Sequence, residues 1–229
     1  MKNLVETAKF KRISVAGRRL AKTKSGVALI EFAYSLPILM AMMMSGAELT
    51  NYATVKMRLS QVALHIADNG GRIGNGTVLS VKKISETDIN DILTGAGLQA
   101  GSLDLYANGR IVLSSLEQMK DSGGKVIADR YYIHWQRCRG SKTHTPKYGT
   151  AGKSSGTNMS GMGPAGQQVT APSGGAVIFV EVAYTYQPLI SSKVVPNVNM
   201  TEIAAMPVRD QRSLTLPTNT EKATISTCT

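Results

Sequence analysis

The sequence has few of the residues that carry most catalytic and metal chemistry. It holds three histidines, two cysteines and one tryptophan in 229 residues, and only 5% of its side chains are aromatic. His65, His134 and His144 are scattered, and His134 stands four residues from Cys138 on a predicted strand, a poor spacing for a shared metal. The sequence contains no CxxC pair, HExxH motif or Walker loop. We therefore predict that the protein is not an enzyme and has no catalytic residue, metal site or cofactor.

Charged side chains are also scarce, at 18%, and the net charge of +11 is concentrated at one end. Residues 1–26 hold eight basic side chains and one acidic side chain. The remaining 203 residues hold 18 basic and 14 acidic side chains, an excess of only +4. These basic residues are dispersed and do not cluster with aromatic side chains, as they would in a nucleic-acid-binding surface. We predict no nucleic-acid partner.

The longest stretch with almost no charge runs over residues 27–47, where Glu31 is the single charged side chain. As a helix it would reach roughly 31 Å, which is about the thickness of the hydrocarbon core of a bilayer. The basic arm before it predicts a cytoplasmic N-terminus and an exported C-terminal part. A soluble core helix fits this charge distribution poorly. A conventional signal peptide cleaved near Ala47 would need a shorter apolar region and a polar break.

Apolar residues at helical spacing continue beyond the apolar stretch, and Asn69-Gly70-Gly71 then supplies a helix stop. We therefore predict one long helix over residues 27–69, a transmembrane segment that continues as a helical stalk. Pro37 removes a backbone donor and clashes with the preceding turn, so it is expected to kink this helix.

The carboxylate of Glu31 needs an explanation, because an ionised group is costly in lipid unless it is paired. Residues three and four positions away on its helical face carry no positive charge. Cleavage after Gly26 would leave a free α-amine on Val27, which could pair with Glu31 of a neighbouring copy. Alternatively, Glu31 stays hydrated at the membrane boundary, where the helix dipole favours it. The charge pattern alone does not choose between these interpretations.

A basic leader, then Gly26, then VALIEF with Glu at the fifth position resembles the class III signal of type IV pilins and pseudopilins. More narrowly, SGVALIEFAYSLPILM resembles the start of TadE-like proteins of the tight-adherence (Tad) pilus system, as do IHWQRCRG at 133–140, AVIFVEVAYTYQPLI at 176–190 and the terminal Cys228. The resemblance implies that a prepilin peptidase cuts between Gly26 and Val27, and that the basic cytoplasmic leader, residues 1–26, is removed. It also implies that Val27 and Glu31 act in subunit assembly.

Two departures from the short major Flp pilins indicate a minor pseudopilin: Phe32 follows the Glu where those pilins have Tyr, and the mature chain would have 203 residues. The predicted function is assembly or priming of a Tad-type adhesive pilus. The implied partners are a prepilin peptidase, the major Flp pilin, other minor pseudopilins, the inner-membrane assembly platform and the lipid bilayer. The implied location is the bacterial inner membrane, with a periplasmic C-terminal domain and incorporation into the pilus left open. The alternative is an uncleaved single-pass protein whose exported domain binds a ligand or an envelope component.

For residues 70–229 we predict a small antiparallel-sheet domain, so that the chain as a whole is α+β and pilin-like. Ser85 to Asp88 has capping-box spacing and should open a short helix, and Asn108-Gly109 has the sequence of a hairpin turn. Strands are expected over 126–136, 176–187 and 202–216. Within the second of these, Glu181 is expected to point outward into solvent.

Residues 140–175 are dense in Gly, Ser and Thr and are expected to form a long surface loop or a disordered excursion. A tolerated insertion and a segment that contacts a partner both remain open. Its GMGPAG stretch matches a dinucleotide fingerprint as text, but no predicted strand precedes it and no helix follows. Cys138 and Cys228 both fall in the exported part, where an oxidising compartment favours a disulfide over two free thiols.

Overall fold

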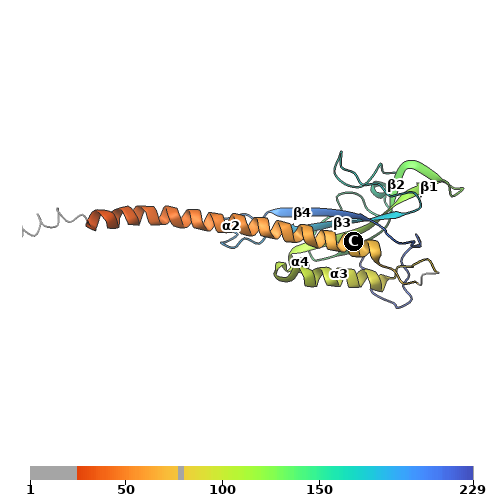
Figure 1. Cartoon of the computed structure of the whole chain (residues 1–229), viewed down its shortest axis with the longest axis horizontal. Helices are drawn as coiled ribbons and strands as arrows, with labels where there is room; N and C mark the ends of the chain where they lie inside the picture. The colour runs from red at the N-terminus through yellow and green to blue at the C-terminus, as the bar shows by residue number, and fades with distance from the viewer. Residues whose placement is uncertain (1–24, 77–79, 229) are drawn as a thin grey trace, which may run out of the picture. The chain divides into compact units, whose positions relative to one another are not determined.

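The computed structural model describes residues 25–76 and 80–228 (Figure 1). The chain divides into two compact units, residues 1–50 and 51–229. The helices and strands, in chain order, are α2 (Ser25–Arg72), α3 (Glu86–Ala100), η1 (Gly101–Leu103), α4 (Leu105–Asn108), β1 (Gly109–Lys120), β2 (Val126–Arg139), η2 (Ser154–Gly156), β3 (Ala176–Thr185) and β4 (Asn199–Pro207). A long N-terminal helix followed by a small antiparallel sheet confirms the predicted α+β fold class. Residues 1–24 of the predicted leader lie outside the described residues.

Helix α2 has 48 residues and begins close to the predicted position. It continues without interruption through Pro37, so the expected kink stays a prediction. Asn69 accepts a hydrogen bond from the backbone N–H of Ile73 at 2.9 Å, which closes the last turn. The helix therefore ends at Arg72, three residues beyond the predicted stop.

Within the second unit, α2 buries one face at helical spacing: Val55, Leu59, Val62, Ala63, Ile66 and Ala67. The end of the helix approaches the sheet closely at two glycines, Gly70 and Gly71. A Cβ on Gly70 would lie 2.8 Å from Cγ2 of Ile178, and one on Gly71 would lie 3.0 Å from the carbonyl oxygen of Pro207. The two glycines that were expected to stop the helix lie within its last turn instead and let that turn pack closely on the sheet.

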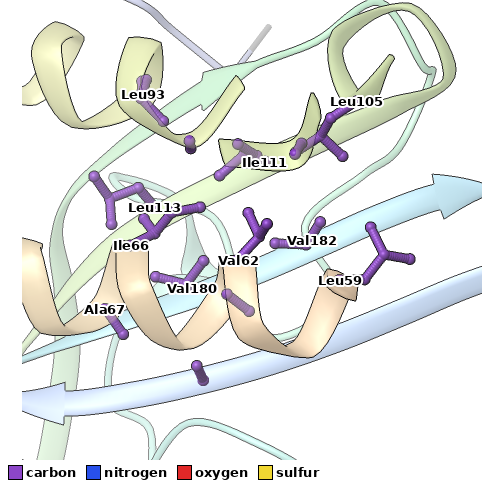
Figure 2. Close-up of a cluster of buried hydrophobic side chains, with 14 of the residues drawn as sticks. Leu59, Val62, Ile66, Ala67, Leu93, Leu105, Ile111, Leu113, Val180 and Val182 are labelled. Carbon is purple, nitrogen blue, oxygen red and sulfur yellow. The ribbon is translucent and has the colours of Figure 1, made fainter. Parts of the chain in front are cut away.

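The sheet has four antiparallel strands in the order β2-β1-β3-β4. Alternate residues of β3 face opposite sides, and both sides are buried. Val180 and Val182 join side chains from α2, α3 and β1 in the larger core cluster (Figure 2). Val177 and Phe179 belong to a second cluster on the other side. The sheet is therefore covered on both faces.

Helix α3 begins where its sequence predicts. The Ser85 side chain accepts from the backbone N–H of Asp88 at 3.1 Å, and the Asp88 carboxylate accepts from the backbone N–H of Ser85 at 2.9 Å. Ile89, Ile92 and Leu93 are buried in the larger cluster. The capping-box prediction is confirmed, because it depends only on residues within one turn.

The prediction of a hairpin at Asn108-Gly109 is wrong. Asn108 ends the short helix α4, and Gly109 starts β1 in an extended conformation with φ −143°. Glycine is required for another reason, since a Cβ there would lie 2.7 Å from the carbonyl oxygen of Ala183. The hairpin that does form joins β1 to β2, and Asp121 Oδ1 accepts from two backbone N–H groups of its turn. The last strand also differs, since β4 ends at Pro207.

Residues 140–175 form a long irregular segment, in agreement with the expected surface loop, but part of the segment packs on the second face of the sheet. Met162 is 1% exposed and belongs with Leu116 and Phe179 to the second core cluster. The Tyr148 ring packs edge-on against Phe179, with centroids 5.4 Å apart. The irregular spacing of the apolar residues in this segment hides the burial, because it follows neither a helical nor a strand period.

Candidate functional site

The residues singled out for processing lie at the start of α2. Gly26 and Val27 are in its first turn, and Glu31 follows one turn later. A Cβ on Gly26 would meet nothing within 4 Å, and Val27 is 57% exposed. Cleavage between Gly26 and Val27 stays a prediction, as does the role of Val27 and Glu31 in assembly.

The large apolar side chains of α2 up to residue 49 are uncovered: Val27, Leu29, Ile30, Phe32, Tyr34, Leu36, Ile38, Leu39, Met40, Met42, Met43, Met44 and Leu49. Among the described residues, the stretch Gly26–Arg72 is the one helix long and apolar enough to cross a membrane by length and composition. An exposed apolar surface this long is unusual for a water-soluble domain and is suited to lipid or to other apolar helices. These features indicate a single-pass membrane protein.

Within residues 25–76 and 80–228, nothing pairs with the Glu31 carboxylate. It stands on an exposed apolar surface, one turn from the bond expected to be cut. Both interpretations of the Glu31 carboxylate therefore stay open: it is hydrated at the membrane boundary, or it pairs with a positive charge from another copy of the chain.

Cys138 and Cys228 are joined by a disulfide, with their Cα atoms 4.8 Å apart and a sequence separation of 90. Cys138 is the penultimate residue of β2, and its backbone N–H donates to the carbonyl oxygen of Ser226 at 2.8 Å. The C-terminal tail is therefore held along the edge of β2, close to the position that the predicted bridge requires.

Buried carboxylates are the polar feature that the sequence did not reveal. Glu181 was expected to face solvent, but it is 1% exposed, so that expectation is wrong. The Nε2 atom of His144 lies 2.5 Å from Glu181 Oε1, and the backbone N–H of Lys147 donates to Oε2 at 3.1 Å. Both partners come from the segment 140–175, which covers this face of β3. Alternation cannot show that a strand is covered on both sides.

A second buried acid, Glu117 in β1, lies between β2 side chains. Its Oε1 is 2.9 Å from Nδ1 of His134, and its Oε2 accepts from the Tyr132 hydroxyl at 3.3 Å. The register between β1 and β2 shifts at His134, which adds one residue to β2 and turns this ring toward Glu117. Burial, followed by the Glu117 charge and hydrogen bond, raises the pKa of Tyr132 to about 12.

One half-buried and one buried arginine, Arg137 and Arg212, have structural partners. Arg137 pairs with the buried Glu86 carboxylate and ties β2 to the start of α3. Arg212 donates to the carbonyl oxygen of Gly70 at 2.9 Å, which caps the last turn of α2. Burial lowers the pKa of Arg212 to about 10, and the Glu117 charge partly opposes this shift. These contacts fix elements together and expose no reactive group.

Two stretches, GMGPAG and GKSSG, match functional motifs by sequence, but neither has the strand–turn–helix backbone that its motif requires. GMGPAG forms a turn closed by the bridge between Met162 and Val169, with no strand before it and no helix after it. GKSSG at 152–156 matches a nucleophile-elbow pattern as text, but Ser154 lies in the short 3-10 turn η2 rather than between a strand and a helix. Among the described residues, no group of three or more His, Cys, Asp or Glu could hold a metal ion.

Together these features define a class: an α+β protein with one apolar N-terminal helix suited to a membrane, and no recognisable catalytic centre in the described residues. The family model described as TadE-like protein matches residues 26–68. The match confirms the resemblance over this helix and is consistent with a TadE-like protein of the Tad pilus system, a structural family. It ends at residue 68, so the stretches at 133–140 and 176–190 are outside it. Searches of curated proteins and of solved structures find no match.

Proposed function

We propose that this chain is a minor pseudopilin that acts in the assembly or priming of a Tad-type pilus. The observation that carries the proposal is the TadE-like match, which begins at Gly26 and ends within α2. The first part of the matched stretch, up to residue 49, forms an uncovered apolar helix, and a basic arm precedes it in the sequence. That arrangement suits a subunit held in the inner membrane, with residues 1–26 in the cytoplasm and the α+β domain in the periplasm.

In this proposal a prepilin peptidase cuts between Gly26 and Val27 and leaves the helix in the membrane. The new α-amine of Val27 is then one turn from Glu31 of its own chain and free to reach Glu31 of the next subunit. Two charges that are each costly in lipid offset one another when subunits pack side by side. The exposed apolar side chains of α2 would supply the rest of the contact with the major Flp pilin, other minor pseudopilins or the assembly platform.

Substitution of Gly26 tests the processing step. Gly26→Leu should block cleavage and leave the full-length chain in the membrane fraction. Gly46→Leu is the matched control, because Gly46 also lies in α2 and a Cβ there would meet nothing within 4 Å. If both variants mature normally, pilin-type processing is excluded and the uncleaved single-pass alternative gains support.

Substitution of Glu31 tests the assembly step separately. Glu31→Gln should mature normally but fail to recover pilus formation in cells that lack the native chain, whereas Glu31→Asp should retain part of it because the charge remains. Shed filaments and surface adhesion are the readouts. Full pilus formation by Glu31→Gln would show that the carboxylate is only a hydrated group at the membrane boundary.

A further inference from the structure

The segment 140–175 and the first half of β2 enclose an open groove of about 490 Å³ on the second unit. The side chains that line it include Arg130, Lys147, Tyr148, Asn158, Ser160 and Gln168. The lining contains two cations, hydroxyl and amide side chains and one aromatic ring, but no acidic residue.

The backbone that forms the groove is fixed from several directions. Met159 and Tyr131 exchange two backbone hydrogen bonds of 2.8 Å, which holds the groove segment against β2. Gln136 donates to the carbonyl oxygen of Gly149 at 3.1 Å in the floor. Gly149 has φ +122°, and a Cβ there would lie 2.5 Å from the carbonyl oxygen of Ser155, so only glycine fits. The groove is thus a built feature of the fold rather than a gap in a loose loop.

The charges in the groove are available to a ligand. Arg130 and Lys147 are exposed, and neither side chain has a partner among the described residues. The acid beneath the groove, Glu181, is already held by His144 and by the backbone of Lys147. Nothing in the lining therefore neutralises the two cations, which favours an anionic ligand.

The other groups in the lining narrow the class of anion. Asn158, which has φ +54°, lines the groove together with Ser160 and Gln168, and we call these three polar residues the amide wall. Ser160 Oγ donates to Gln168 Oε1 at 3.2 Å, which links two of the three side chains. Tyr148 is half-buried against Phe179 and presents a rigid ring. Hydroxyls, amides and one ring match a sugar, whereas two cations are too few for the many phosphates of a nucleic acid.

We propose that this groove binds an acidic polysaccharide, with Arg130 and Lys147 on its carboxylate or sulfate groups and the amide wall on its hydroxyls. The site uses no residue of α2, so it does not depend on the proposed role in pilus assembly. It gives the exported domain a binding activity that neither the family match nor the membrane helix assigns.

The test is binding of the full chain in detergent to polygalacturonate, with dextran sulfate, neutral dextran and polyglutamate as comparison probes. We expect the carboxylated or sulfated polysaccharide to bind, neutral dextran to bind at least tenfold more weakly, and added salt to weaken the interaction. Binding by polygalacturonate but not dextran sulfate would assign a carboxylate as the anion, and the reverse result would assign a sulfate.

The variant pair Arg130→Gln with Lys147→Gln should weaken binding about tenfold. The control pair Lys56→Gln with Lys193→Gln removes the same charge from exposed positions outside the groove and should change binding less than twofold. Asn158→Gly keeps the left-handed backbone and removes only the amide, so it should weaken binding to the sugar without changing the salt dependence.

Three results would overturn the proposal. The first is no binding of either acidic polysaccharide. The second is equal weakening by the groove pair and the control pair, which would show attraction to the net charge alone. The third is binding of polyglutamate as tight as that of polygalacturonate, which would replace the sugar by an acidic peptide.

Discussion

The Nε2 atom of His144 lies 2.5 Å from Oε1 of Glu181, and Glu181 is 1% exposed in the middle of β3, one of the two inner strands of the sheet. The pair joins a glycine-rich segment to β3 and places a charge beneath it. Because the Glu181 carboxylate has so little access to water, its burial must be offset by the groups that the segment supplies, the His144 ring and the backbone N–H of Lys147. The segment 140–175 therefore contributes to the stability of the folded second unit.

His144→Ala should destabilise the second unit by about 3 kcal/mol, since it leaves a buried carboxylate with only a backbone partner. The measurement is denaturant unfolding of the full chain in detergent, followed by the fluorescence of Trp135. This is the single tryptophan of the sequence, and its side chain is 3% exposed. His65→Ala, at an exposed position on α2, is the control and should change the unfolding free energy by less than about 0.5 kcal/mol. Equal, small effects would show that the contact with Glu181 contributes little.

The bond between Cys138 and Cys228 closes a loop of about 90 residues, for which a disulfide contributes roughly 4 kcal/mol. Reduction, or the variant Cys138→Ser with Cys228→Ser, should therefore lower the unfolding free energy by about that amount. Thiol labelling of the exported, unfolded chain checks the premise, because an intact bridge leaves no thiol to label. Two labelled thiols per chain would contradict the bridge.

Gly109→Ala and Gly95→Ala should change stability in opposite directions. A Cβ on Gly109 meets the backbone oxygens of Ala183 and Leu105 at 2.7 and 2.8 Å, so the substitution should cost about 2 kcal/mol. A Cβ on Gly95 meets nothing within 4 Å in the interior of α3, where alanine should stabilise by about 0.5–1 kcal/mol. Thermal unfolding of both variants measures the difference, and an unchanged Gly109→Ala chain would contradict the close approach at the start of β1.

Local signals predicted the elements that depend on neighbours in the chain. The capping box of α3 is one example, since Ser85 and Asp88 satisfy each other within a single turn. The burial of Glu181 could not be predicted in this way, because it depends on His144, which lies 37 residues away on an irregular segment. The same limit explains Asn108-Gly109, where the sequence of a turn is used for close packing against β3.

The part of the candidate site whose residues lie close together in the sequence could be predicted from the sequence alone. Gly26, Val27 and Glu31 are adjacent on one helix, so their spacing is visible without the fold. The groove beside Arg130 and Lys147 combines a strand with a segment that starts after β2 ends. The positive charge of the groove could not be predicted from the sequence. Glu181 was expected to be an exposed acid, and only the structure shows that it is buried.

Tyr132 should keep its proton well above the usual range, since burial and then the Glu117 charge raise its pKa to about 12. The unfolded chain would lose this proton near pH 10. The stabilisation from this group is therefore complete below about pH 10 and is lost as the pH rises through 12. Phenolate absorbance of the native chain minus that of Tyr132→Phe should show a midpoint near pH 12, with Trp135 fluorescence confirming that both are folded. A midpoint near 10 would contradict the buried pairing with Glu117.

The most direct test of the central claim is the intact mass of the membrane-extracted chain, measured with and without its cognate prepilin peptidase. A pilin-type pathway predicts the loss of residues 1–26 only when the peptidase is present, leaving Val27 as the first residue. An unchanged mass in both samples would contradict it and indicate a simple membrane anchor. Loss of everything through Ala47 would contradict it as well, because an ordinary secreted protein would then remain.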